Sequence, residues 1–174
     1  MSKFVLSSDT AIPSFWKEAS ISHIFEQLPP EELAAFNTLS YTIGGMVIFP
    51  ANRIDGKMTI NAARGCHPRI KDRFDLTVEC IRRHYRNDPS NFPLKATLAL
   101  YADFFELFGD FRGYVEFSLL QDLVTADFSS VRFFTPFDGF VTLPFPKTIE
   151  PYREFKRLSI EFIQARNQRI LESG

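Results

Sequence analysis

The chain has 174 residues, 45% of them hydrophobic and 24% charged, which is the make-up of one ordinary globular domain with its own core. No run approaches the roughly 18 apolar residues of a membrane span, and the N-terminus turns polar too soon for a signal peptide. We therefore expect a soluble, cytoplasmic protein with no membrane partner. Its two cysteines, Cys66 and Cys80, do not make a disulfide framework and are expected to be free.

The net charge of −1 conceals an uneven distribution of charge along the chain. Residues 51–87 hold nine Lys/Arg against four Asp/Glu, giving +5, whereas residues 88–130 hold two against seven, giving −5. Such segments either create a positive patch that attracts phosphate or pack together and neutralise each other. Both alternatives stay open at the level of sequence. The twenty Phe residues indicate an aromatic-rich core.

The first half of the chain predicts a short strand, two helices and a hairpin. The strand is expected at residues 4–6 and the first helix at about 14–28. A second helix opens at Pro29 and Pro30, because proline is tolerated in a first turn. Residues 41–50, rich in β-branched and aromatic side chains, predict a strand, and residues 58–60 predict its return after a turn at Asp55 and Gly56.

The paired glycines inside that first hairpin strand, Gly44 and Gly45, indicate either a bulge or the close approach of another backbone or a ligand.

Apolar residues at helical spacing predict helices at about 74–85, 94–108, 113–124 and 149–171. In the first of these, Phe74, Val78 and Ile81 lie on one side, and Asp75 and Glu79 fall on the opposite side. Residues 127–146 are aromatic and Pro-rich and are expected to form short strands or extended segments against the sheet. The prediction is an α+β fold: a mostly helical single domain, residues 1–174, with a small antiparallel sheet built on the hairpin at about 41–62.

Polar residues concentrate where the hairpin leads into the following helix, at residues 52–73. Arg and Lys beside a Gly-containing loop and a helix start can converge on one phosphate through guanidinium and backbone N–H groups. The alternative is an ordinary polar network, in which Arg53 and Arg64 pair with acids such as Asp55 or Asp103. The predicted ligand-binding residues are Arg53, Asp55, Lys57, Asn61, Arg64, His67 and Arg73.

Familiar catalytic and metal-binding patterns are absent from the sequence. Cys80 and His84 are four residues apart, but the adjacent Cys66 and His67 would strain to reach the same ion, so no metal is expected. Asp55-Gly-Lys57 resembles the end of a metal-dependent nuclease motif without its upstream acid. The chain contains no Gly-x-Ser-x-Gly, Walker-type, Gly-x-Gly-x-x-Gly or His-Glu-x-x-His motif. No cofactor is expected, and no reaction is assigned.

Several runs of sequence carry a family resemblance. The run from Tyr41 to Gly65, the run from Asp72 to Tyr85, the run from Asp110 to Phe117 and Tyr152-Arg-Glu-Phe155 together cover most of the chain. They resemble a family of uncharacterised bacterial proteins known only as a domain of unknown function. The resemblance implies a bacterial, cytoplasmic protein with no assigned activity. Relatives of this kind continue upstream of the position of Phe4, so we expect the chain to be a shortened version.

The sequence supports two hypotheses of function. The first is recognition of a phosphate-bearing ligand, a nucleic acid or a nucleotide, by the basic loop–helix region. It predicts that Arg64→Ala abolishes salt-sensitive binding while the fold survives. The alternative is a non-catalytic interaction module that docks a protein partner on an aromatic-rich surface between Phe128 and Phe145.

Overall fold

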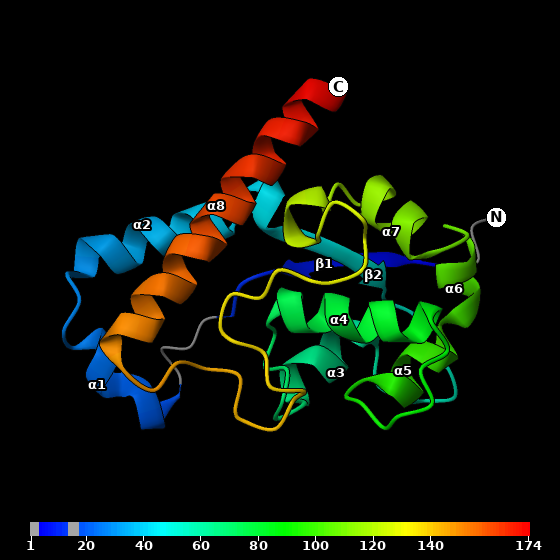
Figure 1. Cartoon of the computed structure of the whole chain (residues 1–174), viewed down its shortest axis with the longest axis horizontal. Helices are drawn as coiled ribbons and strands as arrows, with labels where there is room; N and C mark the ends of the chain where they lie inside the picture. The colour runs from blue at the N-terminus through cyan, green and yellow to red at the C-terminus, as the bar shows by residue number, and fades with distance from the viewer. Residues whose placement is uncertain (1–3, 14–17) are drawn as a thin grey trace.

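The computed structural model describes residues 4–13 and 18–174. Two strands, β1 (Leu6–Thr10) and β2 (Met46–Pro50), form a small antiparallel sheet, and the rest of the regular structure is helical (Figure 1). The predicted class, a mostly helical α+β fold with a small antiparallel sheet, is confirmed. In Figure 1, α2 and α8 lie together on one side of the strands, and α3, α4 and α5 lie on the other.

The sheet is not built on the predicted hairpin. β2 pairs with β1, Leu6 opposite Pro50 and Thr10 opposite Met46. The turn at Asp55 and Gly56 is present, and both residues have positive φ angles of 51° and 68°. Beyond it the chain does not return as a strand but enters α3 (Ile60–Cys66). The reason is local: the Thr59 hydroxyl accepts a hydrogen bond from the Ala62 N–H and so caps the helix.

Gly44 and Gly45 belong to a 3-10 turn, η3 (Ile43–Gly45), directly before β2. A Cβ atom on Gly44 would lie 2.5 Å from the carbonyl oxygen of Ile163, on α8, and one on Gly45 would lie 2.2 Å from that of Ser40. Of the two predicted explanations for these glycines, close approach of another backbone is therefore confirmed. It lets the last helix pack directly against the entry to the sheet.

The predicted helices are confirmed where the apolar spacing is longest and are shorter elsewhere. Of the predicted helix at 14–28, residues 14–17 lie outside the described residues, and two short helical elements within residues 19–25 come after them. The predicted helix at 94–108 is interrupted at the buried Tyr101, whose hydroxyl donates to the carbonyl of Asn52. The helical elements besides α3 and η3 are η2 (Ala19–Ile21), α1 (Ser22–Phe25), α2 (Pro30–Ser40), α4 (Phe74–Tyr85), α5 (Lys95–Leu100), α6 (Ala102–Glu106), α7 (Phe111–Phe117), η4 (Gln121–Leu123) and α8 (Ile149–Ser173).

α4 lies at the centre of the molecule and is covered on both sides. Its apolar side is buried as predicted, but the opposite side is buried too: Asp75 is 0% and Glu79 2% exposed. Residues 127–146 run along this side, and the backbone N–H of Phe134 donates to the Asp75 carboxylate. That segment joins no strand of the sheet and contains only an isolated bridge between Val131 and Val124.

The core is rich in aromatic side chains, as the composition predicted. Phe104, Phe105, Phe108 and Tyr114 pack edge to face, with ring centroids 5.3 to 5.8 Å apart. Both cysteines are free; Cys80 lies in the core and Cys66 is exposed. Within the described part of the chain, no helix has the length and apolar character needed to cross a membrane.

Candidate functional site

Three of the predicted ligand-binding residues lie on one exposed loop. Arg53, Asp55 and Lys57 occupy the turn between β2 and α3 and are all exposed. The turn closes with a hydrogen bond from the Lys57 N–H to the carbonyl of Ile54. Instead of returning as a strand, the chain leads from this loop directly into α3.

Arg64 is fully buried, with a relative exposure of 0%. Its Nε donates to the Thr77 hydroxyl at 3.0 Å, and its Nη1 pairs with the Asp9 carboxylate at 3.2 Å. Its Nη2 donates to the carbonyl oxygens of Thr10 and Asp72. The side chain thus joins α3 to β1 and α4, and its acidic partner is neither Asp55 nor Asp103 but Asp9. Burial leaves this guanidinium without access to a ligand, which corrects its expected role.

Arg73 is also buried, at 2% exposure, and pairs with the fully buried Asp75. Its Nη1 donates to the Thr135 hydroxyl and to the carbonyl of Pro144, each at 2.7 Å. These contacts attach the segment 127–146 to the start of α4. Arg73 therefore holds the fold together and, like Arg64, has no free surface to offer a ligand.

Asn61 and His67, at the two ends of α3, are half-buried. The Asn61 side-chain N–H donates to the Ser7 hydroxyl at 3.1 Å, and its Oδ1 is buried without a partner among the described residues. The His67 ring Nδ1 accepts a hydrogen bond from the Arg69 N–H. The predicted residues are thus dispersed, and of the seven only His67 lines one of the pockets considered below.

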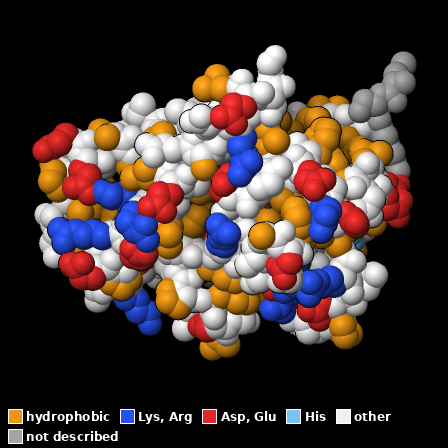
Figure 2. Space-filling model, turned by 45° about the horizontal axis from the view of Figure 1, so that its top comes forward, with side chains coloured by type: hydrophobic (Ala, Val, Ile, Leu, Met, Phe, Trp, Pro, Cys, Tyr) orange, Lys and Arg blue, Asp and Glu red, His pale blue; other side chains and the backbone are white. Residues whose placement is uncertain are grey.

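The positive segment 51–87 does not neutralise the negative segment 88–130 as a block. Its arginines pair mainly within the segment: Arg82 and Arg83 both bind the buried Glu79, at 2.7 and 2.8 Å. Arg83 also approaches an acid of the negative segment, Asp88, at 3.9 Å. Figure 2 shows Lys/Arg and Asp/Glu interspersed on the face in view.

One pocket brings cationic and aromatic side chains together. This cationic pocket, of about 470 Å³, lies between the α3–α4 loop, the loop that leads into α5, and Phe140. Its described lining contains two basic side chains, Arg69 and Lys95, together with His67, and no carboxylate. The complete lining is His67, Arg69, Asn91, Phe92, Pro93, Leu94, Lys95, Ala96, Thr97, Gly139 and Phe140.

The hydrogen bonds of the cationic pocket leave Arg69 as its available cation. No ion pair or side-chain hydrogen bond holds the Arg69 guanidinium within residues 4–13 and 18–174. Lys95 Nζ donates to the carbonyls of Asp88 and Ser90, at 2.9 and 2.7 Å. Burial, and then the nearby Arg69 charge, lower the pKa of His67, so its ring is neutral near pH 7.

The aromatic wall of this pocket is held by a paired arginine. Arg83, which binds Glu79, lies 5.3 Å from the ring centre of Phe140 and 5.9 Å from that of Phe92. Lys95 Nζ lies 5.5 Å from the Phe92 ring centre. Cation–π contacts of this kind fix the rings in place. The pocket therefore has a basic side and an aromatic side.

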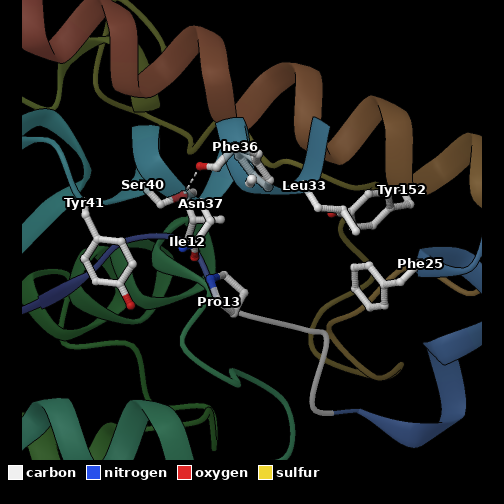
Figure 3. A pocket seen from close by; sticks show the side chains of 10 residues that line it. Ile12, Pro13, Phe25, Leu33, Phe36, Asn37, Ser40, Tyr41 and Tyr152 are labelled. Carbon is white, nitrogen blue, oxygen red and sulfur yellow. Dashed lines mark hydrogen bonds between the residues drawn. The ribbon is translucent and has the colours of Figure 1, made fainter. Parts of the chain in front are cut away.

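A different pocket, of about 410 Å³, lies beside α2 (Figure 3). Figure 3 shows Tyr41, Phe25 and Tyr152 around it. The Ser40 hydroxyl, also in its lining, donates to the carbonyl of Phe36 and is satisfied internally. The described residues that line this pocket carry no charged group, so it presents less chemistry for recognition than the cationic pocket.

These features define a mostly helical α+β domain with an aromatic-rich core and a pocket that combines basic and aromatic side chains. Residues 1–170 match the model of DUF6994, a family of unknown function, and the chain belongs to that family. The resemblance seen in the sequence is confirmed. No curated protein and no solved structure matched the chain.

Proposed function

We propose that the protein recognises a phosphate-bearing ligand, a nucleotide or a nucleic acid, in the cationic pocket. The observation that carries the proposal is that Arg69 and Lys95 line the same pocket, whose described lining has no carboxylate. Arg69 supports it most, because its guanidinium has no partner among residues 4–13 and 18–174, and such a group can bind a phosphate through two parallel hydrogen bonds.

The aromatic side of the pocket supports a ligand that carries a base as well as a phosphate. Phe140 is half-buried and Phe92 is buried, and Arg83 lies near both rings. Stacking of a base on an aromatic ring is worth roughly 1–3 kcal/mol and tolerates any base. The proposal therefore favours a nucleotide unit over a free phosphate, without preference for one base.

The test is titration of the purified protein with ATP and with a short single-stranded RNA, at low and at moderate salt. Arg69→Ala removes a charge-assisted hydrogen bond worth about 1.5–3 kcal/mol, so it should weaken binding by about 10- to 100-fold. Arg53→Ala, in the exposed loop, is the matched control and should leave binding nearly unchanged. RNA binding by the unmodified protein should weaken as salt is raised, because neutralised phosphates release counterions.

The two possible locations give opposite results. If Arg53→Ala and Lys57→Ala lose binding while Arg69→Ala does not, the ligand lies at the exposed loop, as the sequence first indicated. If neither ATP nor RNA binds to the unmodified protein, the proposed function is wrong.

A second proposal is the non-catalytic interaction module on the aromatic-rich segment between Phe128 and Phe145. Its rings are half-buried or buried, but Val141 and Leu143 within it are 69% and 44% exposed. These two apolar side chains favour a protein partner over free solvent. In an affinity capture, the double variant Val141→Asp, Leu143→Asp should lose the protein partner that the unmodified protein retains. If the double variant retains the same partner as the unmodified protein, this surface is not the docking site.

We also propose a bacterial, cytoplasmic setting. The bacterial origin rests on the family resemblance, and the two free cysteines support a reducing compartment. Fractionation of cells that carry a tagged copy tests the location, and recovery of the protein outside the cytoplasmic fraction would refute it.

A further inference from the structure

A mostly apolar pocket of about 430 Å³ lies where the sheet meets α6, α7 and α8, and it shares no lining residue with the cationic pocket. We call it the apolar pocket. Four of its side chains are more than half exposed: Leu6, Ile48, Leu107 and Phe117. Figure 2 shows hydrophobic side chains gathered near the N-terminal end of the chain, the part of the molecule where Figure 1 places α6 and α7. Small-molecule sites occupy about 300–1,000 Å³ and have mainly apolar walls with a few placed polar groups.

The placed polar group here is Arg166, on α8. Its Nε donates to the carbonyl of Ser118 at 3.1 Å, and its Nη1 donates to the carbonyls of Gly44 and Met46 at 3.0 and 2.6 Å. Three carbonyl acceptors from two separate segments therefore fix the plane of the guanidinium. Across the described parts of the chain, no carboxylate pairs with Arg166, and its Nη2 has no hydrogen-bond partner.

This arrangement differs from that of the two buried arginines described above. Arg64 and Arg73 are each paired with an aspartate, whereas the acceptors that Arg166 contacts among the described residues are all neutral carbonyl oxygens. Burial lowers the pKa of Arg166, which reflects the cost of removing its charge from water without an acid beside it. An anion in the pocket would offset that cost, and the guanidinium is already oriented to receive it.

We propose that the apolar pocket binds a small amphipathic anion, a carboxylate with an aliphatic tail, whose head group meets Nη2 of Arg166 and whose tail packs along Phe104, Leu107 and Phe117. Charge complementarity with Arg166, which pairs with no acid in the described part of the chain, selects the head group, and the apolar walls select the tail. The site is independent of the proposed phosphate-bearing ligand.

The first experiment is isothermal titration of the full chain with decanoate, octanoate and 1-octanol, each below its micelle or solubility limit. A buried methylene is worth about 0.8 kcal/mol, roughly fourfold in affinity, so octanoate should bind about 15-fold more weakly than decanoate. The affinity for the uncharged 1-octanol should be at least about tenfold lower than for octanoate, because 1-octanol lacks the charge-assisted contact with Arg166.

Variants at Ile48 separate the charge effect from folding. Arg166→Gln should abolish the preference for octanoate over 1-octanol, but it also loses donors to three carbonyls and can destabilise the chain. Ile48 is 57% exposed at the pocket, so it tolerates a polar substitution. Ile48→Glu should weaken decanoate binding more than Ile48→Gln does, whereas the two variants should bind 1-octanol equally. Leu171→Glu, 82% exposed near the C-terminal end of α8, is the distant control and should bind as the unmodified chain does.

Three results would overturn the proposal. The first is the absence of a charge effect, seen either as equal affinity for octanoate and 1-octanol or as equal weakening of decanoate binding by Ile48→Glu and Ile48→Gln. The second is binding to phosphatidylglycerol vesicles without binding to monomeric decanoate, which would indicate a membrane surface. The third is a ligand-free dimer in sedimentation equilibrium that Ile48→Glu dissociates, which would indicate that a second copy of the chain covers this pocket.

Discussion

Arg64→Met should destabilise the fold, because it leaves the Asp9 carboxylate without its buried cation and three oxygen acceptors without their donor. Arg64 is 0% exposed, pairs with Asp9, and donates to the Thr77 hydroxyl and two backbone carbonyls. Burial raises the pKa of Asp72 and the Arg64 charge opposes that rise, so the substitution also removes electrostatic support from Asp72. Removing one member of a fully buried ion pair typically costs about 3–5 kcal/mol, and because the Asp9 side chain is 32% exposed and can be hydrated, we expect the lower end, about 3 kcal/mol.

Urea denaturation followed by circular dichroism measures this loss as a change in the free energy of unfolding. A chain of this size shifts its melting temperature by about 2–4 °C per kcal/mol, so a drop of about 6–12 °C is expected in a thermal scan. Arg153→Met is the matched control, because Arg153 pairs with Glu150 on the surface, where both side chains are more than half exposed. Such a pair is worth at most about 1 kcal/mol.

The same variant separates a structural from a ligand-binding role for Arg64. If Arg64 bound a phosphate, its loss would abolish binding and leave stability nearly intact. A change in unfolding free energy below about 1 kcal/mol for Arg64→Met, equal to that of the Arg153→Met control, would refute the reasoning from burial.

Three further predictions concern backbone geometry and pH. Gly45→Ala places a Cβ 2.2 Å from a carbonyl oxygen of α2, and this overpacking should cost about 1–3 kcal/mol in urea denaturation. Asn87→Val puts a β-branched residue at a φ of 52° and should cost about 1–2 kcal/mol in a thermal scan, whereas Asn91→Val, exposed and without a positive φ, should be near neutral. Burial lowers the pKa of His67 and His84 in the folded state below the ordinary value of 6.5. Both rings are neutral above pH 6.5, and at lower pH the unfolded chain takes up protons first, so the free energy of unfolding should fall as the pH drops below 6.5. Urea midpoints at pH 7.5 and 5.5 measure this slope, and it should flatten when both histidines are replaced by Gln; an unchanged slope would contradict the assignment.

The sequence predicts the elements that local periodicity determines and misses the pairing that depends on distant contacts. α4 and α8 carry apolar side chains at three- and four-residue spacing over several turns, and both were found at nearly the predicted bounds. The partner of β2 is β1, some forty residues upstream. The predicted return strand does not form, because the Thr59 cap starts a helix at that point. The residues Asp55 and Gly56 determine a turn, but they do not determine whether the chain continues from it as a strand or as a helix.

The candidate site was harder to predict because charge alone does not reveal burial. Arg64 and Arg73 were interpreted from the sequence as basic residues near a loop, but each meets an acid, Asp9 and Asp75, that the fold brings beside it. The polar residues 52–73 include Arg69, which lines the proposed pocket but was not among the predicted ligand-binding residues. No local signal indicates Lys95, which reaches the same pocket from beyond α4.

The state of each arginine decides what its surroundings can recognise. An arginine that pairs with a buried acid, as Arg73 pairs with Asp75, stabilises the fold and is not exposed to a ligand. The Arg69 guanidinium has no ion pair or hydrogen bond with the described residues and lines a pocket with Lys95, so the proposed phosphate-bearing ligand would bind it through charge, and binding should depend on salt. Arg166 is held by three carbonyls among apolar side chains, so its ligand must add a tail, and binding should depend on tail length more than on salt. Measuring salt dependence and chain-length dependence on the same protein therefore distinguishes the two pockets even when one ligand carries both a phosphate and an acyl chain.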